Sequence, residues 1–356
     1  MGRKGIIGIV LVGLIGVGAY LGRHKIKALF SDTKRTENKT EVKFLFREDP
    51  TATQLAHELV EAGVLSNQKQ FFDAVKEYAI DTNAFAAGKY IILSGTTHAN
   101  LLDGFVKGEN GQGKAEQKVR VLFNRCEVIP DIGSNISKCI LADSASIVDY
   151  ILNPKTLKKY GFTAEQVPAL FIPKEYEMYF DTDAETFVEL MAAEFRNYWT
   201  PEREQKLKNI GLKTPSQAVT LASIVYMEQS RVPEEWPIIA KLYLNRIEQG
   251  IPLQADPTFK FCWPDRLKGV EHLLNVHRDK DCPYNTYIYT GIPPGPICLP
   301  PYEVVDAVLN PADVSYLFLC GDGTGKHNFA TTNAEHNKNV AAYRKWLKEY
   351  LNSKDE

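Results

Sequence analysis

Several features that mark common classes of protein are missing from this 356-residue sequence. It has no long low-complexity segment, so most of the chain is expected to fold. No internal repeat stands out either. The sequence also lacks a concentrated Lys/Arg stripe, and its 42 basic and 44 acidic residues nearly cancel. Because such a stripe is what neutralises a phosphate backbone, we expect no nucleic-acid partner.

Cysteine is scarce, and the six residues all lie beyond position 125: Cys126, Cys139, Cys262, Cys282, Cys298 and Cys320. Their spacings match no zinc signature, and the histidine pair His327 and His336, nine residues apart, has no regular metal spacing. We therefore expect no metal site. Six cysteines permit fifteen pairings. Disulfides in an exported domain and buried free thiols both remain open.

One long apolar run stands out, residues 5–22 (GIIGIVLVGLIGVGAYLG), and it is uncharged. As a helix its 18 residues would reach roughly 27 Å, close to the thickness of a bilayer core of about 30 Å. The terminal position and charged flanks argue against a buried core helix. The basic residues that follow the run argue against a cleaved signal peptide. We predict a retained transmembrane helix, whose orientation the charges on both sides leave open.

A small unit is predicted after the anchor. Residues 23–41 form a polar linker, because they are charged and lack apolar periodicity from Ser31 onward. Within residues 42–115 the pattern predicts a strand, two helices and a strand: 43–46, 51–62, 67–78 and 88–93. This βααβ order resembles the sugar-binding LysM module, although any small α+β unit would have the same order.

Residues 116–351 are predicted to form a second, larger domain. A strand is expected at 118–123, a helix around 144–152, and helical patterns from about Asp183 onward. Strands and helices mix without the regular alternation of a doubly wound sheet. The fold class is therefore α+β.

The helix predicted at 214–230 (TPSQAVTLASIVYMEQS) has a well-marked start. Thr214 is the candidate N-cap, Pro215 takes the first helical position, and Gln217 completes a capping-box pattern. Further along, Glu228 shares a helical face with Leu221, Ile224 and Val225. A carboxylate thus stands where an aliphatic side chain belongs.

Two effects are expected to raise the pKa of Glu228. Burial disfavours the charged form, and the helix end, which Pro233 places nearby, adds the negative pole of the macrodipole. A carboxylic acid that stays protonated near neutral pH is a candidate general acid. The alternative is a helix-end glutamate that turns to solvent or pairs with Arg231.

The C-terminal third combines turn-rich polar segments with aromatic residues, as carbohydrate clefts do. The segments are 254–257 (QADP), 284–287 (YNTY), 291–296 (GIPPGP), 327–329 (HNF) and 335–337 (EHN). Taken singly each is weak, because tyrosines and prolines usually serve packing and chain reversal.

Together with 221–225 (LASIV), Glu228 and Asn245-Arg246, these segments closely resemble the YceG-like family of endolytic murein transglycosylases. The resemblance covers roughly residues 42–351. It implies a cytoplasmic N-terminus at 1–4, a single-pass anchor in the cytoplasmic membrane and a catalytic domain on the extracytoplasmic side. The implied reaction cleaves the β-1,4 bond after N-acetylmuramic acid inside nascent peptidoglycan strands and leaves 1,6-anhydro ends. In the family this is proposed to terminate synthesis by nearby penicillin-binding proteins.

Carried over by position, Glu228 is the implied catalytic residue. The implied substrate-binding or supporting residues are Gln254, Asp256, Asn285, Tyr287, His327, His336 and Asn337. Tyr226 and Met227 depart from the family pattern, in which these positions are often charged, and residues 171–179 follow it only loosely. No cofactor is implied, since one carboxylate and the sugar's own hydroxyl suffice.

Two other functions remain open. A wall-binding scaffold would use the LysM-like unit without catalysis. A hydrolytic muramidase would need a second carboxylate about 5 to 9.5 Å from the first. The available residues are Asp256, Glu234 and Glu235. Asp256 is the one that discriminates between a hydrolase and a transglycosylase.

Overall fold

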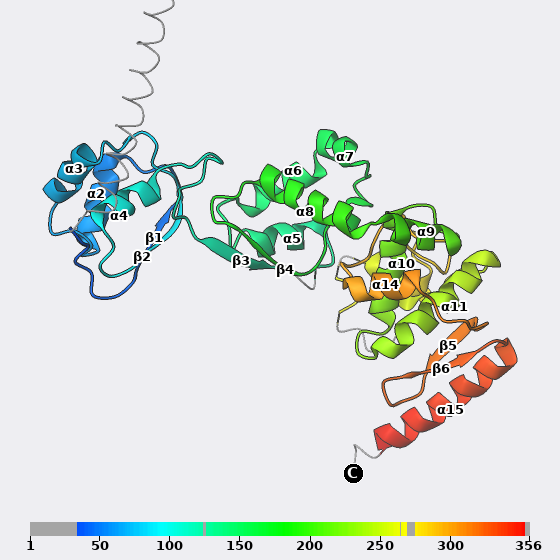
Figure 1. Ribbon diagram of the computed structural model, residues 1–356. Helices are drawn as coiled ribbons and strands as arrows, with labels where there is room; N and C mark the ends of the chain where they lie inside the picture. Colours follow the sequence, from blue (N-terminus) through cyan, green and yellow to red (C-terminus); the bar gives the residue numbers. More distant parts are fainter. Residues whose placement is uncertain (1–33, 124–125, 264, 269–274, 353–356) are drawn as a thin grey trace, which may run out of the picture. The chain divides into compact units, whose positions relative to one another are not determined.

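The computed structural model describes residues 34–352 except 124–125, 264 and 269–274 (Figure 1). These residues form two compact units. The first contains the described residues up to Arg120 together with Cys139–Leu141 and Glu177–Thr182, and the second contains the remainder. The transmembrane helix predicted at 5–22 lies outside the described residues. Within the described residues, no helix has the length and apolar character needed to cross a bilayer.

The prediction of an α+β fold is confirmed, because helices accompany three two-stranded sheets in the described part of the chain. These sheets pair β1 (Val42–Phe46) with β2 (Gly88–Ile92), β3 (Lys118–Leu122) with β4 (Glu175–Tyr179), and β5 (Phe318–Gly321) with β6 (His327–Ala330). Strand β3 and helix α6 (Ser144–Leu152) lie where the sequence pattern predicts them.

The first unit begins with the predicted strand, two helices and strand. They are β1 (Val42–Phe46), α2 (Ala52–Glu61), α3 (Gln68–Glu77) and β2 (Gly88–Ile92), followed by α4 (His98–Phe105). The two strands are antiparallel, with Phe44 opposite Tyr90. Alternate residues of β1, Phe44 and Phe46, are buried against Leu55, Phe71 and Phe105. A side-chain oxygen caps each of the two helices at its N-terminus, from Thr51 and Asn67.

The second unit is mainly helical. Its helices are α5 (Ile129–Ile136), α6 (Ser144–Leu152), α7 (Pro154–Tyr160), α8 (Ala184–Tyr198), α9 (Pro201–Asn209), α10 (Pro215–Glu228), α11 (Trp236–Glu248), α12 (Asp256–Phe261), α13 (Asn275–Arg278), α14 (Tyr302–Leu309) and α15 (Asn333–Asn352), with short 3₁₀ turns at Val167–Leu170 and Pro233–Glu235. The hairpin of β5 (Phe318–Gly321) and β6 (His327–Ala330) lies beside α15 near the C-terminus (Figure 1).

Helix α10 lies at the centre of this unit and contacts α11, α12 and α14. It starts as predicted, since the Thr214 hydroxyl accepts from the Gln217 N–H at 3.3 Å. The Gln217 side chain accepts from the N–H of Lys213 at 2.8 Å rather than from that of Thr214. Every residue from Ala218 to Val225 is buried, so the helix has no solvent face along that stretch. The helix ends at Glu228, because Gln229 is extended with φ of −140° and ψ of 96°, and the 3₁₀ turn begins later, at Pro233.

Polar side chains of α11 attach this core to the hairpin. Asn245 donates from its amide to the carbonyls of Val314 and Tyr316, both at 3.1 Å. Arg246 donates to the carbonyl of Leu317 at 2.7 Å. These bonds fix the entry to β5 beside α11.

Candidate active site

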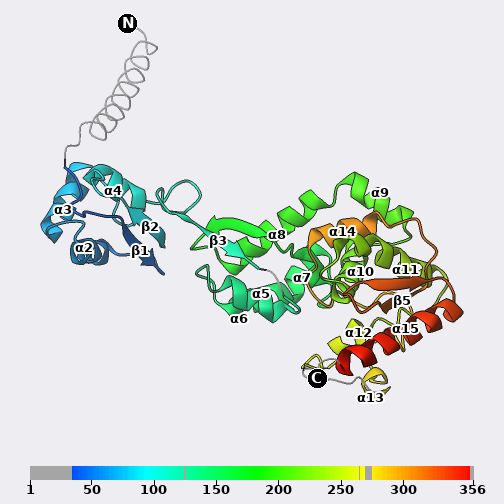
Figure 2. The same ribbon diagram turned by 90° about the horizontal axis from the view of Figure 1, so that it is seen from below.

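A cavity of about 470 Å³ opens in the second unit and brings together residues far apart in the sequence. Figure 2 shows the elements that contribute to it: α10, α11, α12, α13, β5 and α15. Its lining consists of Glu228, Leu242, Tyr243, Arg246, Leu253, Gln254, Asp256, Arg278, Tyr287, Leu317, Phe318, Leu319, Cys320, His336 and Tyr343. Two carboxylates, two guanidinium groups and one imidazole thus share a partly aromatic pocket.

Glu228, the last residue of α10, lines this cavity and is only partly exposed. Its Oε1 atom accepts a hydrogen bond from the Tyr243 hydroxyl at 2.9 Å. The pKa of Glu228 is raised to about 7. Burial is the main cause of the rise and the charge of Asp256 adds to it, whereas the Tyr243 hydrogen bond and Lys260 act in the opposite direction. A carboxyl group with this pKa is a substantial fraction protonated at neutral pH, as a general acid requires.

Asp256, the first residue of α12, is held by two partners. The Tyr287 hydroxyl donates to its Oδ1 atom at 2.5 Å. The Nη2 atom of Arg278 lies 3.6 Å from its Oδ2 atom in a salt bridge. Burial and the hydrogen bond to Asp256 raise the pKa of Tyr287, so its hydroxyl remains a proton donor.

Arg246 is a buried cation in the cavity wall, with 6% of its surface exposed. Besides Leu317, its guanidinium donates to the Pro252 carbonyl at 2.8 Å and to the Gln254 Oε1 atom at 2.7 Å. Arg246 thus engages the oxygen of the Gln254 amide, and the NH₂ group of that amide, a donor, belongs to a residue that lines the cavity. Gln254 has φ of +53°, a strained conformation for a residue with a side chain and one that occurs preferentially at functional sites.

His336 contributes a neutral imidazole to the cavity. Burial lowers its pKa, and the nearby charge of Arg246 lowers it further. Its ring stacks on Phe318 with centroids 5.1 Å apart. The buried Nδ1 atom has no hydrogen-bond partner among the described residues.

Comparison with known proteins assigns a family to this arrangement. A sequence profile of the YceG-like family matches residues 44–342. The chain belongs to the YceG-like family. The endolytic murein transglycosylase of Bacillus subtilis (strain 168) is 29% identical over 163 residues, which are 46% of this chain and 44% of the relative. That of Streptococcus pneumoniae serotype 2 (strain D39 / NCTC 7466) is 26% identical over 225 residues, 59% of this chain and 39% of the relative.

The chain thus matches less than half the length of these curated relatives. Among solved structures, a YceG-like protein from Listeria monocytogenes aligns with a TM-score of 0.52 at 21% identity, covering 85% of this chain and 99% of the other. At this identity the likeness establishes a shared fold. The family resemblance predicted from the sequence is confirmed.

The structure gathers five of the eight site residues that the YceG-like motifs implied around one cavity: Glu228, Gln254, Asp256, Tyr287 and His336. The other three do not line it. Asn285 is fully buried, and its amide donates to the carbonyls of Arg278 at 2.6 Å and Lys280 at 2.9 Å. His327 binds Glu235, with its Nδ1 atom 2.7 Å from the carboxylate. Asn337 is exposed on α15.

Among the cavity residues to which sequence reasoning assigned no role are Tyr243, Arg278, Cys320 and Tyr343. Arg246 stood in the quoted Asn245-Arg246 motif but received no function. No local pattern marks Tyr243 as the partner of Glu228, because the contact depends on how α11 folds back along α10. The only sequence feature that could have drawn attention to Arg278 is its position between Cys262 and Cys282.

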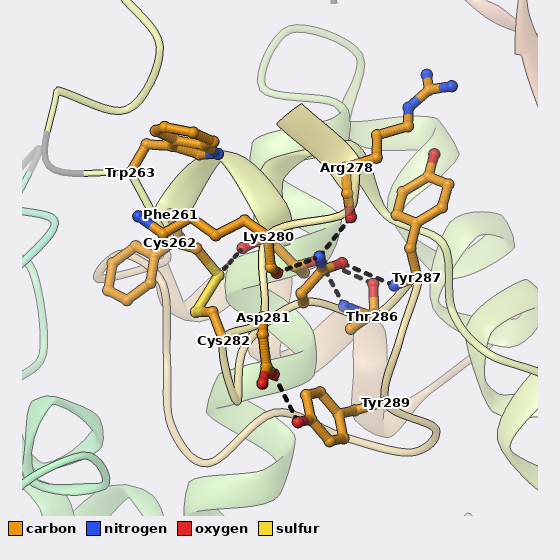
Figure 3. Close-up of a disulfide and its surroundings, with 12 residues drawn as sticks. Phe261, Cys262, Trp263, Arg278, Lys280, Asp281, Cys282, Thr286, Tyr287 and Tyr289 are labelled. Atoms are coloured by element: carbon orange, nitrogen blue, oxygen red, sulfur yellow. Dashed lines mark hydrogen bonds between the residues drawn. A yellow bond between two sulfur atoms is a disulfide. The ribbon is translucent and has the colours of Figure 1, made fainter. Parts of the chain in front are cut away.

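One disulfide joins Cys262, which follows α12, to Cys282. Figure 3 shows it beside the segment that carries Arg278, Lys280 and Tyr287. The Lys280 ammonium lies over the Trp263 ring, 4.3 Å from its centroid. The pairing is one of the fifteen that the sequence left open. Cys298 and Cys320 are not disulfide-bonded.

Proposed function

We propose that this YceG-like chain is an endolytic peptidoglycan transglycosylase, a lyase that cuts the β-1,4 bond between N-acetylmuramic acid and N-acetylglucosamine within nascent glycan strands. The observation that carries the proposal is the cavity containing Glu228, whose pKa burial raises to about 7. The names of the Bacillus and Streptococcus relatives support the same activity.

In the proposed reaction Glu228 acts first as an acid and then as a base. The protonated carboxyl gives its proton to the glycosidic oxygen as the bond from that oxygen to C1 of the muramic acid breaks. The resulting carboxylate accepts the proton of the C6 hydroxyl as the C6 oxygen bonds to C1. One product has a 1,6-anhydro end and the other a free 4-hydroxyl. Glu228 ends protonated, and no water is consumed.

The surrounding residues suit this cycle. The Tyr243 hydroxyl, whose pKa burial raises, donates to Glu228 and stabilises its carboxylate between the two proton transfers. The carboxylate of Asp256 can stabilise positive charge that develops at C1. The Gln254 amide, fixed by Arg246, offers a donor to an acetamido or peptide carbonyl of the strand.

The proposal includes the setting of the enzyme. A helix at 5–22 would anchor the chain in the cytoplasmic membrane, with the cavity on the extracytoplasmic side, where the Cys262–Cys282 disulfide would persist. The βααβ unit of residues 42–92 would act as a LysM-like glycan-binding module. Cleavage within new strands would end their elongation by penicillin-binding protein synthases nearby.

End-group analysis tests the proposal. Purified peptidoglycan strands are digested with the full-length chain, Glu228→Gln, or Glu234→Gln, which alters a nearby exposed carboxylate. We expect 1,6-anhydro ends from the wild type and from Glu234→Gln, and a loss of at least about 10³-fold with Glu228→Gln. New reducing ends from the wild type would instead indicate a hydrolase. Intact strands that still bind would indicate a scaffold.

A further inference from the structure

Asp256 is the second carboxylate of the Glu228 cavity, and both of its oxygens are engaged. Oδ1 accepts from the Tyr287 hydroxyl at 2.5 Å, and Oδ2 lies 3.6 Å from the Arg278 guanidinium. A retaining or inverting glycosidase needs a second carboxylate that is available to attack C1 or to activate water. In this cavity Asp256 is the second carboxylate, and it is already engaged by one hydrogen bond and one ion pair.

The two partners of Asp256, Arg278 and Tyr287, contact each other and share a hydrogen-bonding residue. The Arg278 guanidinium lies over the Tyr287 ring, 5.2 Å from its centroid. The buried Asn285 amide donates to the Arg278 carbonyl and accepts from the Tyr287 N–H at 3.0 Å, so one side chain joins both segments. The Tyr287 ring also packs edge-to-face against Phe259 of α12, with centroids 5.7 Å apart.

The disulfide adds a covalent link to this arrangement. Cys262 immediately follows α12, which begins with Asp256, and Cys282 follows the segment that carries Arg278. The bond therefore limits how far the Arg278 segment can move from the helix that carries Asp256, and Figure 3 shows both around it. Three kinds of contact thus hold Arg278 and Tyr287 near Asp256: the hydrogen bonds of Asn285, ring packing on Phe259 and a disulfide.

We propose that Tyr287 and Arg278 are positioning residues that determine the product of the reaction by keeping Asp256 from activating water. The inference rests on the proposed function. With Asp256 occupied, the C6 hydroxyl of the substrate is the nucleophile that reaches C1, and the product is the anhydro end. With Asp256 released, its carboxylate takes a proton from water, the water oxygen bonds to C1, and Glu228 protonates the leaving oxygen as before. The bond that breaks is the same, but one water is consumed and a reducing end forms.

The test measures the ratio of the two kinds of end. Strands are first reduced with borohydride, digested, and then reduced with borodeuteride, so that only reducing ends made in the assay take up deuterium. The full-length chain is compared with Tyr287→Phe, which keeps the ring and removes the hydroxyl, and with Arg278→Gln. Lys280→Gln is the matched control, because it removes a positive charge from the same segment but one that lies over Trp263.

We expect the water-derived share of new ends to rise about tenfold in Tyr287→Phe and in Arg278→Gln, which corresponds to about 1.4 kcal/mol between the competing transition states. Adding Asp256→Asn to either variant should return the share to the wild-type value, as should restoring the charge with Arg278→Lys. Lys280→Gln should match the wild type. A purely structural role would lower the rate in the variants without moving this ratio.

Two results would overturn the inference: variants that form only anhydro ends at any rate, or water-derived ends that persist after Asp256→Asn. Failure of the proposed function looks different. In that case the wild type itself would produce no new anhydro ends, and the inference would fall with it. Thermal unfolding of each variant identifies any that fails to fold. If one does, the end-group ratio of Tyr287→Phe, the smallest change, decides whether the inference holds.

Discussion

At the scale of single residues, the proposed reaction depends on a balance at Glu228. Burial and the negative charge of Asp256 favour its protonated form, whereas Tyr243 and Lys260 favour the carboxylate. A fully apolar site would keep the acid protonated but would hinder its second role as a base. A fully solvated site would leave it ionised before the reaction begins. Removing the Tyr243 hydroxyl, which donates to Glu228, should shift this balance toward the protonated form.

Tyr243→Phe is predicted to shift the pH dependence of activity upward. Without the hydroxyl that lowers its pKa, Glu228 should keep its proton to higher pH, by about one unit. The rate of anhydro-end formation across pH 5 to 9 measures this shift, with Tyr350→Phe as a control on an exposed tyrosine of α15. An unchanged alkaline limb would mean that Tyr243 does not set the pKa of Glu228.

At the scale of secondary-structure elements, Gln229 fixes the end of α10. This side chain is 4% exposed. Its oxygen accepts from the N–H groups of Arg231 and Val232, at 3.1 and 3.2 Å. Its NH₂ group donates to the Glu235 carboxylate and to the Gly325 carbonyl, both at 3.0 Å. One amide therefore joins α10, the 3₁₀ turn and the β5–β6 hairpin next to Glu228.

Gln229→Ala should destabilise the protein by about 2–4 kcal/mol, because it leaves two N–H groups and part of a buried carboxylate without their partner. Gln249→Ala is the matched control, since Gln249 caps the end of α11 but is exposed. That variant should change stability by less than about 0.5 kcal/mol. Urea unfolding of both variants measures the change in the free energy of unfolding. Equal changes would show that the buried contacts of Gln229 do not contribute to stability beyond those of an exposed glutamine.

Local features of helix α10 could be predicted from the sequence, whereas contacts between distant segments could not. The cap at Thr214 and the aliphatic spacing around Glu228 are local, so α10 and its carboxylate could be predicted. Asn285 and His327 belong to the motif-bearing segments, yet they hold backbone and Glu235 in place rather than lining the cavity. Sequence motifs do not distinguish a residue that supports the site from one that lines it. Tyr243 and Arg278 could not be predicted, because their contacts arise only when α11 and the Cys262–Cys282 segment fold back.

At the scale of the whole molecule, the first unit has its own buried acid. Glu116 is 7% exposed and packs so closely on Gly88 that a Cβ at that glycine would lie 2.5 Å from its carboxyl carbon. Burial, followed by the charge of Asp181, raises the pKa of Glu116 to about 7. The folded protein therefore binds this proton more tightly than the unfolded chain does, in which the pKa lies near 4.5.

It follows that the stability contributed by protonated Glu116 is fully present below pH 4.5 and is lost as the pH rises through about 7. Glu116→Gln should make the protein more stable than the wild type at pH 8, by about 1–3 kcal/mol, and give no gain at pH 4.5. Thermal unfolding at both pH values measures the difference. The exposed Glu109→Gln is the control. A gain that is equal at the two pH values would contradict the titration of Glu116.

The central claim is that one carboxyl group, Glu228, protonated near neutral pH, serves the whole reaction. The most direct test is the rate at which the wild-type chain forms 1,6-anhydro ends as a function of pH. A pKa of about 7 predicts that kcat/KM is constant in the acidic range and falls about tenfold per pH unit above pH 7. A rate that stays constant up to pH 9, or that already falls from pH 4.5, would contradict Glu228 as the acid.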